Sequence, residues 1–449
     1  MVEQRLSSVF VRFTADYGMV FVLLSLGAVF SLTTARSQNP GGAAAGHLLA
    51  DQILSEVPDN ADVLIVVGET ILDTRFAEVL AQDLDQGGAT VLQVVQGGPS
   101  QVRQTLEEIA SRGTVVDVIA CQVRQSRYRF IRRPSSALKP LADARVMVPK
   151  PYFWPDFLKT SNIRAIANRV VVIAIIAIGM TFVIITSGID LSVGSLIAFS
   201  AVVTALLIRM GGAAEATAGV MVLSGLAAIA LCGALGAFSG SMVTVFQVPA
   251  FIVTLGMMQV ARGLAFILAD SQSIYQVPES FTLLGRGFVL GIPNPVLLML
   301  MLYAVAHVMM TRMTLGRYIY AVGGNKEAAR LSGVPVRRVL LICYTACGAL
   351  AGLGGVITAS QLKSGEPNYG DMAELEVIAA VVVGGTSLSG GEGKVLGTLI
   401  GALVMAVIRN GMNLMNIEPN VQRVVLGIVI LGAVLLDKLK KSGWRLPRD

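Results

Sequence analysis

Charge, histidine and cysteine are all scarce in this sequence of 449 residues. Charged side chains make up only 14% of the residues, whereas ordinary soluble domains carry about 25%. Hydrophobic residues account for 54%, and the mean hydropathy is +0.69. This composition excludes a soluble enzyme or a single-span receptor, and it predicts a membrane protein with about ten helices of roughly 20 residues each.

The scarcity of cysteine and histidine excludes two further classes of site. Cysteines occur only at positions 121, 232, 343 and 347, too few and too scattered for a disulfide framework. Cys343 and Cys347 share a helix face with no histidine nearby, so we interpret them as packing residues. His47 and His307 lie far apart in the sequence, and we predict no metal site.

The charged residues that are present divide the chain into regions. Residues 33–150 contain 25 charged side chains in 118 positions, whereas residues 170–313 contain 8 in 144. The first region is predicted to face water and the second to lie in lipid. We therefore expect a cytoplasmic N-terminus and first span over 1–32, an extracytoplasmic insert over 33–150, a membrane core over 151–437 and a basic cytoplasmic tail over 438–449.

Ten apolar runs support this division. They cover residues 17–32, 170–188, 191–208, 218–245, 250–268, 296–313, 339–359, 375–385, 395–408 and 421–436. Basic residues are concentrated between the sixth and seventh runs and in the C-terminal tail, which the positive-inside rule places in the cytoplasm. With ten spans both termini are cytoplasmic, and the insert lies on the opposite side.

Three motifs stand out in the membrane region. The first is GIDLSVGS at 188–195, which places Asp190 between two apolar runs with Ser192 close behind it. An intramembrane carboxylate is costly and faces a bundle interior or a cavity. Asp190 is either a helix cap, which satisfies free backbone N–H groups, or, together with Ser192, a residue of the substrate pathway or its gate.

The second motif is the glycine-rich stretch VVVGGTSLSGGEGKVLGT at 381–398. Its glycines disfavour an unbroken helix, and its hydroxyl side chains can satisfy freed backbone groups. We predict a broken span there, with Gly384, Gly385 and Thr386 beside the substrate pathway. The alternative is a re-entrant turn that only shapes the bundle. The phosphate-binding pattern Gly-x4-Gly-Lys-Ser/Thr is absent from the motif.

The third motif is the basic loop GRYIYAVGGNKEAARLSGVPVRRV at 316–339. Asn325 is a good N-cap, residues 326–332 make about two helical turns, Gly333 can end the helix and Pro335 prevents its continuation. The expected helix has a small apolar face formed by Ala328, Ala329 and Leu331. It suits a groove on a partner protein, and the alternative is an interfacial helix held on anionic lipid.

Together with VPAFIVTLGMM at 248–258, these motifs resemble the permease subunits of the monosaccharide-type ABC importers, the ribose-permease group. The similarity covers about 151–440. It implies an all-α polytopic fold with no catalytic residues and no cofactor bound by this chain. It also implies a second permease chain in a homodimer, a cytoplasmic ATPase that holds ATP and Mg, an external solute-binding protein and a sugar substrate in a bacterial cytoplasmic (inner) membrane. No nucleic-acid partner is expected.

The resemblance also implies a role for the basic loop, 315–338. Its short helix becomes the coupling element that docks in the ATPase groove, with eight residues carried over as a set: Asn325, Lys326, Glu327, Ala328, Ala329, Arg330, Leu331 and Gly333.

The insert at 33–150 has a different pattern. Helical stretches at 46–54, 73–84 and 99–112 alternate with buried strands at 63–69, 90–95 and 115–120, which predicts a small α/β domain with a parallel sheet. About 80 residues resemble one lobe of the type I periplasmic sugar-binding proteins. The resemblance implies that Arg75 faces a ligand, although the expected Gly-Phe and Asn-Asp pairs are absent. The domain is then a sugar site, a docking or regulatory module, or a structural remnant.

Two other functions compete with an ATP-driven importer. An ion-coupled secondary carrier needs intramembrane ionisable groups, and only Asp190 and Arg262 qualify between 170 and 313. A non-transporting sensor that uses the external lobe would need a cytoplasmic signalling domain, whereas the basic tail is short. The sequence therefore favours an ABC importer permease with about ten transmembrane helices, one or more of them broken.

Overall fold

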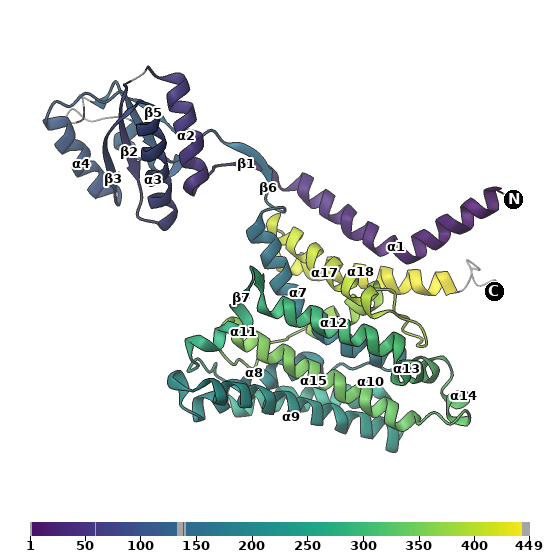
Figure 1. Ribbon diagram of the computed structural model, residues 1–449. Helices are drawn as coiled ribbons and strands as arrows, with labels where there is room; N and C mark the ends of the chain where they lie inside the picture. Colours follow the sequence, from purple (N-terminus) through teal and green to yellow (C-terminus); the bar gives the residue numbers. More distant parts are fainter. Residues whose placement is uncertain (1, 59, 133–137, 139–140, 442–449) are drawn as a thin grey trace. The chain divides into compact units, whose positions relative to one another are not determined.

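The computed structural model describes residues 2–58, 60–132, 138 and 141–441, and it divides into two compact units (Figure 1). One unit is helical and comprises Met1–Thr34 and Asp156–Asp449. The other comprises Ala35–Pro155 and contains a parallel sheet.

The helical unit consists mainly of long α-helices. They are α1 (Val2–Thr33), α7 (Thr160–Ile185), α8 (Val193–Met210), α9 (Ala218–Val245), α10 (Ala250–Leu268), α12 (Asn294–Arg312), α15 (Val336–Leu362), α16 (Ala373–Val383), α17 (Val395–Leu414) and α18 (Pro419–Lys441). Shorter elements connect them: η2 (Ala213–Glu215), η3 (Glu279–Phe281), α11 (Thr282–Arg286), β7 (Phe288–Val289), β8 (Ile292–Pro293), α13 (Thr314–Gly324) and α14 (Lys326–Leu331).

Among the described residues, seven helices are long and apolar enough to cross a membrane: α7, α8, α9, α10, α12, α15 and α17. Two shorter apolar helices cover Gly18–Thr33 and Pro419–Leu435. These findings confirm a polytopic α-helical membrane protein. Helix α16 has 11 residues, too few to cross a hydrocarbon core of about 30 Å at 1.5 Å per residue.

Helix α15 is the central packing element, in contact with α7, α8 and α9. Its contact with α9 depends on glycine, because a methyl group on Gly236 would overlap the carbonyl oxygen of Tyr344. A methyl group on Gly348 would likewise overlap the carbonyl oxygen of Cys232. Small residues at such contacts allow helix backbones to approach closely in lipid, where van der Waals packing drives association.

We predict that Gly236→Val destabilises the helical unit, because the new side chain must push α9 away from α15. Overpacking of this kind typically costs 1–3 kcal/mol. The matched control is Gly263→Val on α10, where no atom lies within 4 Å of an added methyl group. Thermal unfolding in detergent measures both variants, and equal midpoints for the two would contradict the predicted α9–α15 contact.

The second unit is built around a four-stranded parallel sheet. Its elements are β1 (Ala35–Gln38), α2 (Gly42–Glu56), β2 (Asp62–Val67), α3 (Ile71–Gln86), β3 (Thr90–Gln96), α4 (Pro99–Ser111), β4 (Val118–Cys121), α5 (Val123–Ser126), α6 (Arg129–Arg132), β5 (Arg145–Met147) and β6 (Tyr152–Pro155). The strand order is β3-β2-β4-β5, and β1 pairs separately with β6 in antiparallel register.

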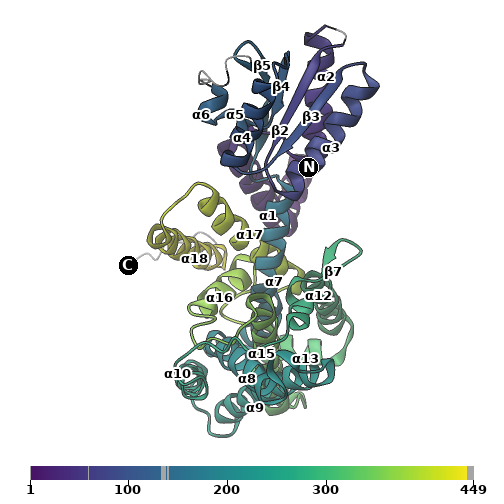
Figure 2. The same cartoon turned by 90° about the vertical axis from the view of Figure 1, so that its left-hand side faces the viewer.

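Each face of this sheet is covered by its own hydrophobic core. Figure 2 shows α2 and α3 on one face and α4 on the other. Leu49, Phe76 and Leu80 are fully buried on the first face, and Val102 and Leu106 are buried on the second. Strand β2 is buried on both faces because it lies in the middle of the sheet, which explains its continuous apolar sequence.

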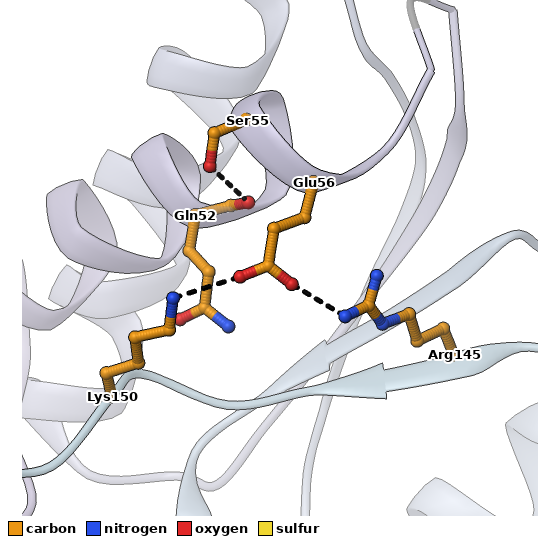
Figure 3. A network of polar contacts seen from close by, with 5 residues as sticks. All are labelled: Gln52, Ser55, Glu56, Arg145 and Lys150. Carbon is orange, nitrogen blue, oxygen red and sulfur yellow. Dashed lines mark hydrogen bonds and ion pairs between the residues drawn. The ribbon is translucent and has the colours of Figure 1, made fainter.

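An ion-pair network joins the end of α2 to the last strand of the sheet (Figure 3). Glu56 accepts hydrogen bonds from Arg145 at 2.6 Å and from Lys150 at 3.0 Å. The hydrogen bond from Lys150, with the charge of Arg145 beside it, lowers the pKa of Glu56 below its ordinary value. The Arg145 and Lys150 side chains are largely exposed and that of Glu56 is partly exposed, so this network stabilises the unit only slightly.

The hydrophobic cores of the two units share no residue among those described. We therefore predict that replacing residues 40–148 with a short flexible linker, which keeps β1 and β6, leaves the helical unit folded. Size-exclusion chromatography and the thermal midpoint of the shortened protein test this. Aggregation, or loss of the unfolding transition, would show that the α/β unit is part of the helical fold.

Candidate functional site

The basic loop forms a helical projection between α12 and α15. Asn325 is the N-cap of α14, where its side-chain oxygen accepts the Ala328 N–H at 2.9 Å. Gly333 ends the projection with a φ of +83°, a conformation that glycine adopts readily. Lys326, Glu327 and Arg330 are exposed, and Leu331 is 82% exposed.

The inward face of this helix differs from the sequence prediction in one residue. Ala329 is expected on the partner-binding face, but it is only 5% exposed and belongs to the hydrophobic core of its own chain. Its burial holds α14 against the start of α15. The apolar side chains that α14 exposes are therefore those of Leu331 and Ala328.

The glycine-rich motif lies directly against the element that precedes this projection. Residues 384–394 connect α16 to α17. Tyr320 of α13 donates a hydrogen bond to the Gly393 carbonyl at 2.7 Å, and the Gly391 N–H donates to the Ile185 carbonyl at the end of α7 at 2.9 Å. The connection thus joins α13, α7, α16 and α17.

Of the three residues predicted beside the substrate pathway in this motif, Gly384 has a packing role. It faces Gly397, so α16 and α17 approach there without side chains between them. Gly385 has a φ of +87° and turns the chain. Thr386 is 1% exposed, and its hydroxyl has no hydrogen-bond partner among the described residues.

Asp190 is fully buried in the turn before α8. One of its carboxylate oxygens accepts hydrogen bonds from the Ser192 N–H at 3.0 Å and the Ser192 hydroxyl at 2.6 Å. The N-cap of α8 is Ser192, so Asp190 closes the preceding turn rather than capping the helix itself. Tyr344 and Cys347 of α15 lie near the carboxyl group.

The structure also reveals a site that the sequence reasoning missed. Between α15 and α16, residues 363–372 form an irregular segment that runs along α8. A methyl group on Gly365 would lie 2.6 Å from the Ala201 carbonyl oxygen and 2.7 Å from Ala205. Farther along, Gly370 faces Gly194 and Ile197. The helical structure is therefore interrupted between α15 and α16, before the glycine-rich motif.

Charged side chains gather around the interruption. Arg262 of α10 donates hydrogen bonds to the carbonyls of Pro367 at 2.7 Å and Tyr369 at 3.0 Å. Glu376 of α16 pairs with Arg409 of α17. The run at 375–385 was short for a span, and Pro367, Gly370 and Asp371 precede it, which is the sequence signal that could have located the interruption.

The α/β unit holds the remaining predicted site residue. Arg75 is exposed near the start of α3, which follows the carboxyl end of β2. Thr70 and Asp73 form a capping box that fixes the start of this helix. Arg75 thus lies at the carboxyl edge of the sheet, where open α/β sheets bind ligands.

Seven long apolar helices in the described part of the chain, an irregular segment packed among them and an exposed loop helix are typical of a polytopic membrane transport protein. A family model described as the branched-chain amino acid transport system / permease component matches residues 162–434. The chain belongs to this permease family. It is therefore a transport subunit and not an enzyme.

Individual relatives agree with the family match. The chain is 43% identical to the ribose import permease protein of Escherichia coli strain K12 over 291 residues, which is 64% of this chain and 88% of that protein. The ribose import permease protein of Bacillus subtilis strain 168 is 42% identical over 290 residues, with 64% and 88% covered. The D-allose transport system permease protein of Escherichia coli strain K12 is 38% identical over 286 residues, with 63% and 85% covered. No solved structure matches the chain.

Two neighbouring glycines allow the contact between α13 and the end of α7 to be tested. A methyl group on Gly323 would overlap the Ile185 carbonyl, whereas no atom lies within 4 Å of one on Gly324. Alanine is favoured over glycine in helices by about 1 kcal/mol. We predict that Gly323→Ala lowers the thermal midpoint in detergent, whereas Gly324→Ala leaves it unchanged or raises it. The same response from both variants would contradict the close packing of α13 on α7.

Proposed function

We propose that this chain is the membrane-spanning permease subunit of an ATP-driven ABC importer for a monosaccharide or a similar small polar solute. The proposal rests on the family membership and on relatives named as permeases for ribose, allose and L-arabinose. An importer of this type needs an ATPase and a solute-binding protein as partners. ATP and Mg would be held by the cytoplasmic ATPase, and a second copy of this chain would complete the pathway.

The proposed topology has ten spans. The seven long apolar helices, the apolar parts of α1 and α18, and the interrupted segment with α16 supply that number. Basic residues around α14 support a cytoplasmic location for this end of the bundle. Both termini then lie in the cytoplasm of a bacterial inner membrane, and the α/β unit lies outside, where we propose it as a docking or regulatory module.

The observation that carries the coupling proposal is the exposure of α14. Leu331 exposes 82% of its surface although it is a large apolar residue. Asn325 and Gly333 fix the ends of the helix, so the projection is ordered without a partner. A short helix with an exposed apolar residue and flanking charges suits a groove on the ATPase.

We predict that Leu331→Asp abolishes co-purification of the ATPase subunit, because a carboxylate would enter an apolar groove without a partner. The change should leave the permease folded, since the side chain makes little contact with its own chain. Leu290→Asp is the matched control: Leu290 is 97% exposed and lies between β7 and β8, at the opposite end of α12. Co-expression, affinity purification and ATPase activity of the eluate measure the outcome. Full ATPase recovery with Leu331→Asp would contradict docking through α14.

A further inference from the structure

A small β-hairpin projects from the helical unit beside the start of α12 (Figure 2). Strands β7 and β8 form a two-stranded antiparallel sheet, with Phe288 opposite Pro293 and Val289 opposite Ile292. A two-stranded hairpin is at best marginally stable in water. The surroundings of this hairpin therefore decide whether it holds its shape.

The turn of the hairpin places a bulky apolar residue in an unfavourable backbone conformation. Leu290 and Gly291 are its two central residues, with φ of +52° and +78°, as in a type I′ turn. Glycine, asparagine and aspartate suit such positions, whereas leucine is strained there. Leu290 is also 97% exposed, so contacts with its own chain do little to offset the strain. A strained residue of this kind indicates a function for the side chain.

One face of the hairpin points away from the chain and is apolar. Opposite residues in a sheet share a face. Pro293 is buried, and the Phe288 ring lies under the Arg164 guanidinium at 5.8 Å, so this pair faces the helical unit. Val289 and Ile292 lie on the other face, with 51% and 41% of their surfaces exposed. These two residues and the leucine of the turn are here called the apolar tip: Val289, Leu290 and Ile292.

The apolar tip adjoins a helix that crosses the membrane. Helix α12 begins at Asn294, directly after the hairpin, and is among the helices long and apolar enough to span a bilayer. Leu300, Met301, Val305 and Val308 form an exposed apolar stripe along it. The stripe places α12 at the edge of the helical unit. The hairpin thus lies where the chain enters the bilayer, at the depth of the lipid headgroups.

Positive charge flanks the apolar tip. Residues 282–310 contain no acidic side chain, and Arg286 is the charged residue among them. Arg286 and Arg164 are both exposed. Arginine packs its apolar stem on apolar surface while its charged end stays at the polar boundary. The two arginines therefore complement the negative phosphates of phospholipids.

The size of the apolar tip favours lipid over a protein partner. A stable protein interface buries about 800 Å² on each partner, which is more than three side chains at one turn supply. Insertion into lipid needs no surface of that extent, because each apolar side chain that leaves water contributes separately.

We infer that the apolar tip inserts into the outer leaflet of the membrane, at the boundary between phospholipid headgroups and acyl chains, where it anchors the outer end of α12. The proposed function supplies one part of this inference, namely that this end of α12 is the outer one. A change at the tip should leave ATPase co-purification from detergent intact, because no bilayer is present and α14 lies beyond the other end of α12.

Fluorescence quenching of the full-length permease in lipid nanodiscs tests the insertion. The four native cysteines are buried, so a bimane probe labels introduced cysteines above a low background. Val289→Cys places the probe in the apolar tip, and Met301→Cys places it on the exposed stripe of α12. Gln93→Cys is the control on an exposed position of the α/β unit. The quenchers are aqueous iodide and a phospholipid with a nitroxide near the headgroup end of its acyl chain.

We expect the nitroxide lipid to quench the probe at Val289→Cys and Met301→Cys, and iodide to quench it at Gln93→Cys. Adding Leu290→Asn to Val289→Cys should replace quenching by lipid with quenching by iodide, because asparagine suits the turn but is polar. Adding Leu290→Met should preserve quenching by lipid, since methionine is apolar and similar in size. The thermal midpoint of Leu290→Asn in detergent should equal or exceed that of the wild type, which separates lost insertion from lost folding.

Three results would overturn the inference. Quenching of Val289→Cys by iodide and not by the lipid would place the tip in water, where a solute-binding protein could reach it. Protection from both quenchers would show that protein covers the tip, as a second copy of this chain would. Lipid quenching that persists with Leu290→Asn would show that insertion does not depend on the apolar side chain.

Failure of the proposed function is a separate result, because the quenching experiment needs neither an ATPase nor a sugar. An impermeant maleimide added to spheroplasts should not label Glu327→Cys on α14. Labelling there would overturn the proposed orientation and assign the tip to the cytoplasmic leaflet, whereas the contact between tip and lipid would stand.

Discussion

A backbone polar group in lipid must have a hydrogen-bond partner or be shielded by protein, and the arrangement of the helical unit follows from this requirement. The irregular segment at 363–372 cannot face lipid. It lies against α8, where Gly194, Gly365 and Gly370 let the two backbones approach, and Arg262 donates to two of its carbonyl groups. Contacts with α8 and α10 thus shield backbone groups of this segment.

Another close approach of backbones joins the chain after α16 to the basic loop. Gly323 of α13 lies against Ile185 of α7, and the chain after α16 bonds to both elements through Tyr320 and Gly391. A movement of α14, driven from outside the chain, would therefore reach α16 through packed backbone rather than through flexible side chains. Packed interfaces of this kind switch between discrete arrangements instead of deforming continuously.

Hydropathy and cap chemistry predicted much of the helical unit. The apolar runs identified the long helices because lipid selects for length and composition, and Asn325, Gly333 and Pro335 predicted the projection because caps act locally. The place of the interruption was missed because it depends on contacts between distant segments, such as Arg262 with Pro367. Ala329 was assigned to the exposed face because helical periodicity alone does not show which side of a short helix packs on α15.

The fold of the α/β unit was predictable from the sequence, whereas its role was not. The alternation of helices and strands follows from composition, and the structure places α2, β2, α3, β3, α4 and β4 over the stretches where the sequence indicated them. The role of the unit does not follow from its fold, because a fold supports many functions and a function depends on a site. Arg75 lies at the expected edge of the sheet, but one exposed arginine is compatible with a docking surface as well as with a ligand.

The central claim is that this permease moves a sugar only when a partner ATPase works through it. The most direct test uses proteoliposomes that contain the permease with its ATPase and solute-binding protein. Radiolabelled sugar is added outside the vesicles, and a nucleotide is enclosed inside them. The account predicts accumulation above the external concentration with ATP and none with a non-hydrolysable analogue. Equal entry with both nucleotides, ending at the external concentration, would identify a passive channel and contradict the account.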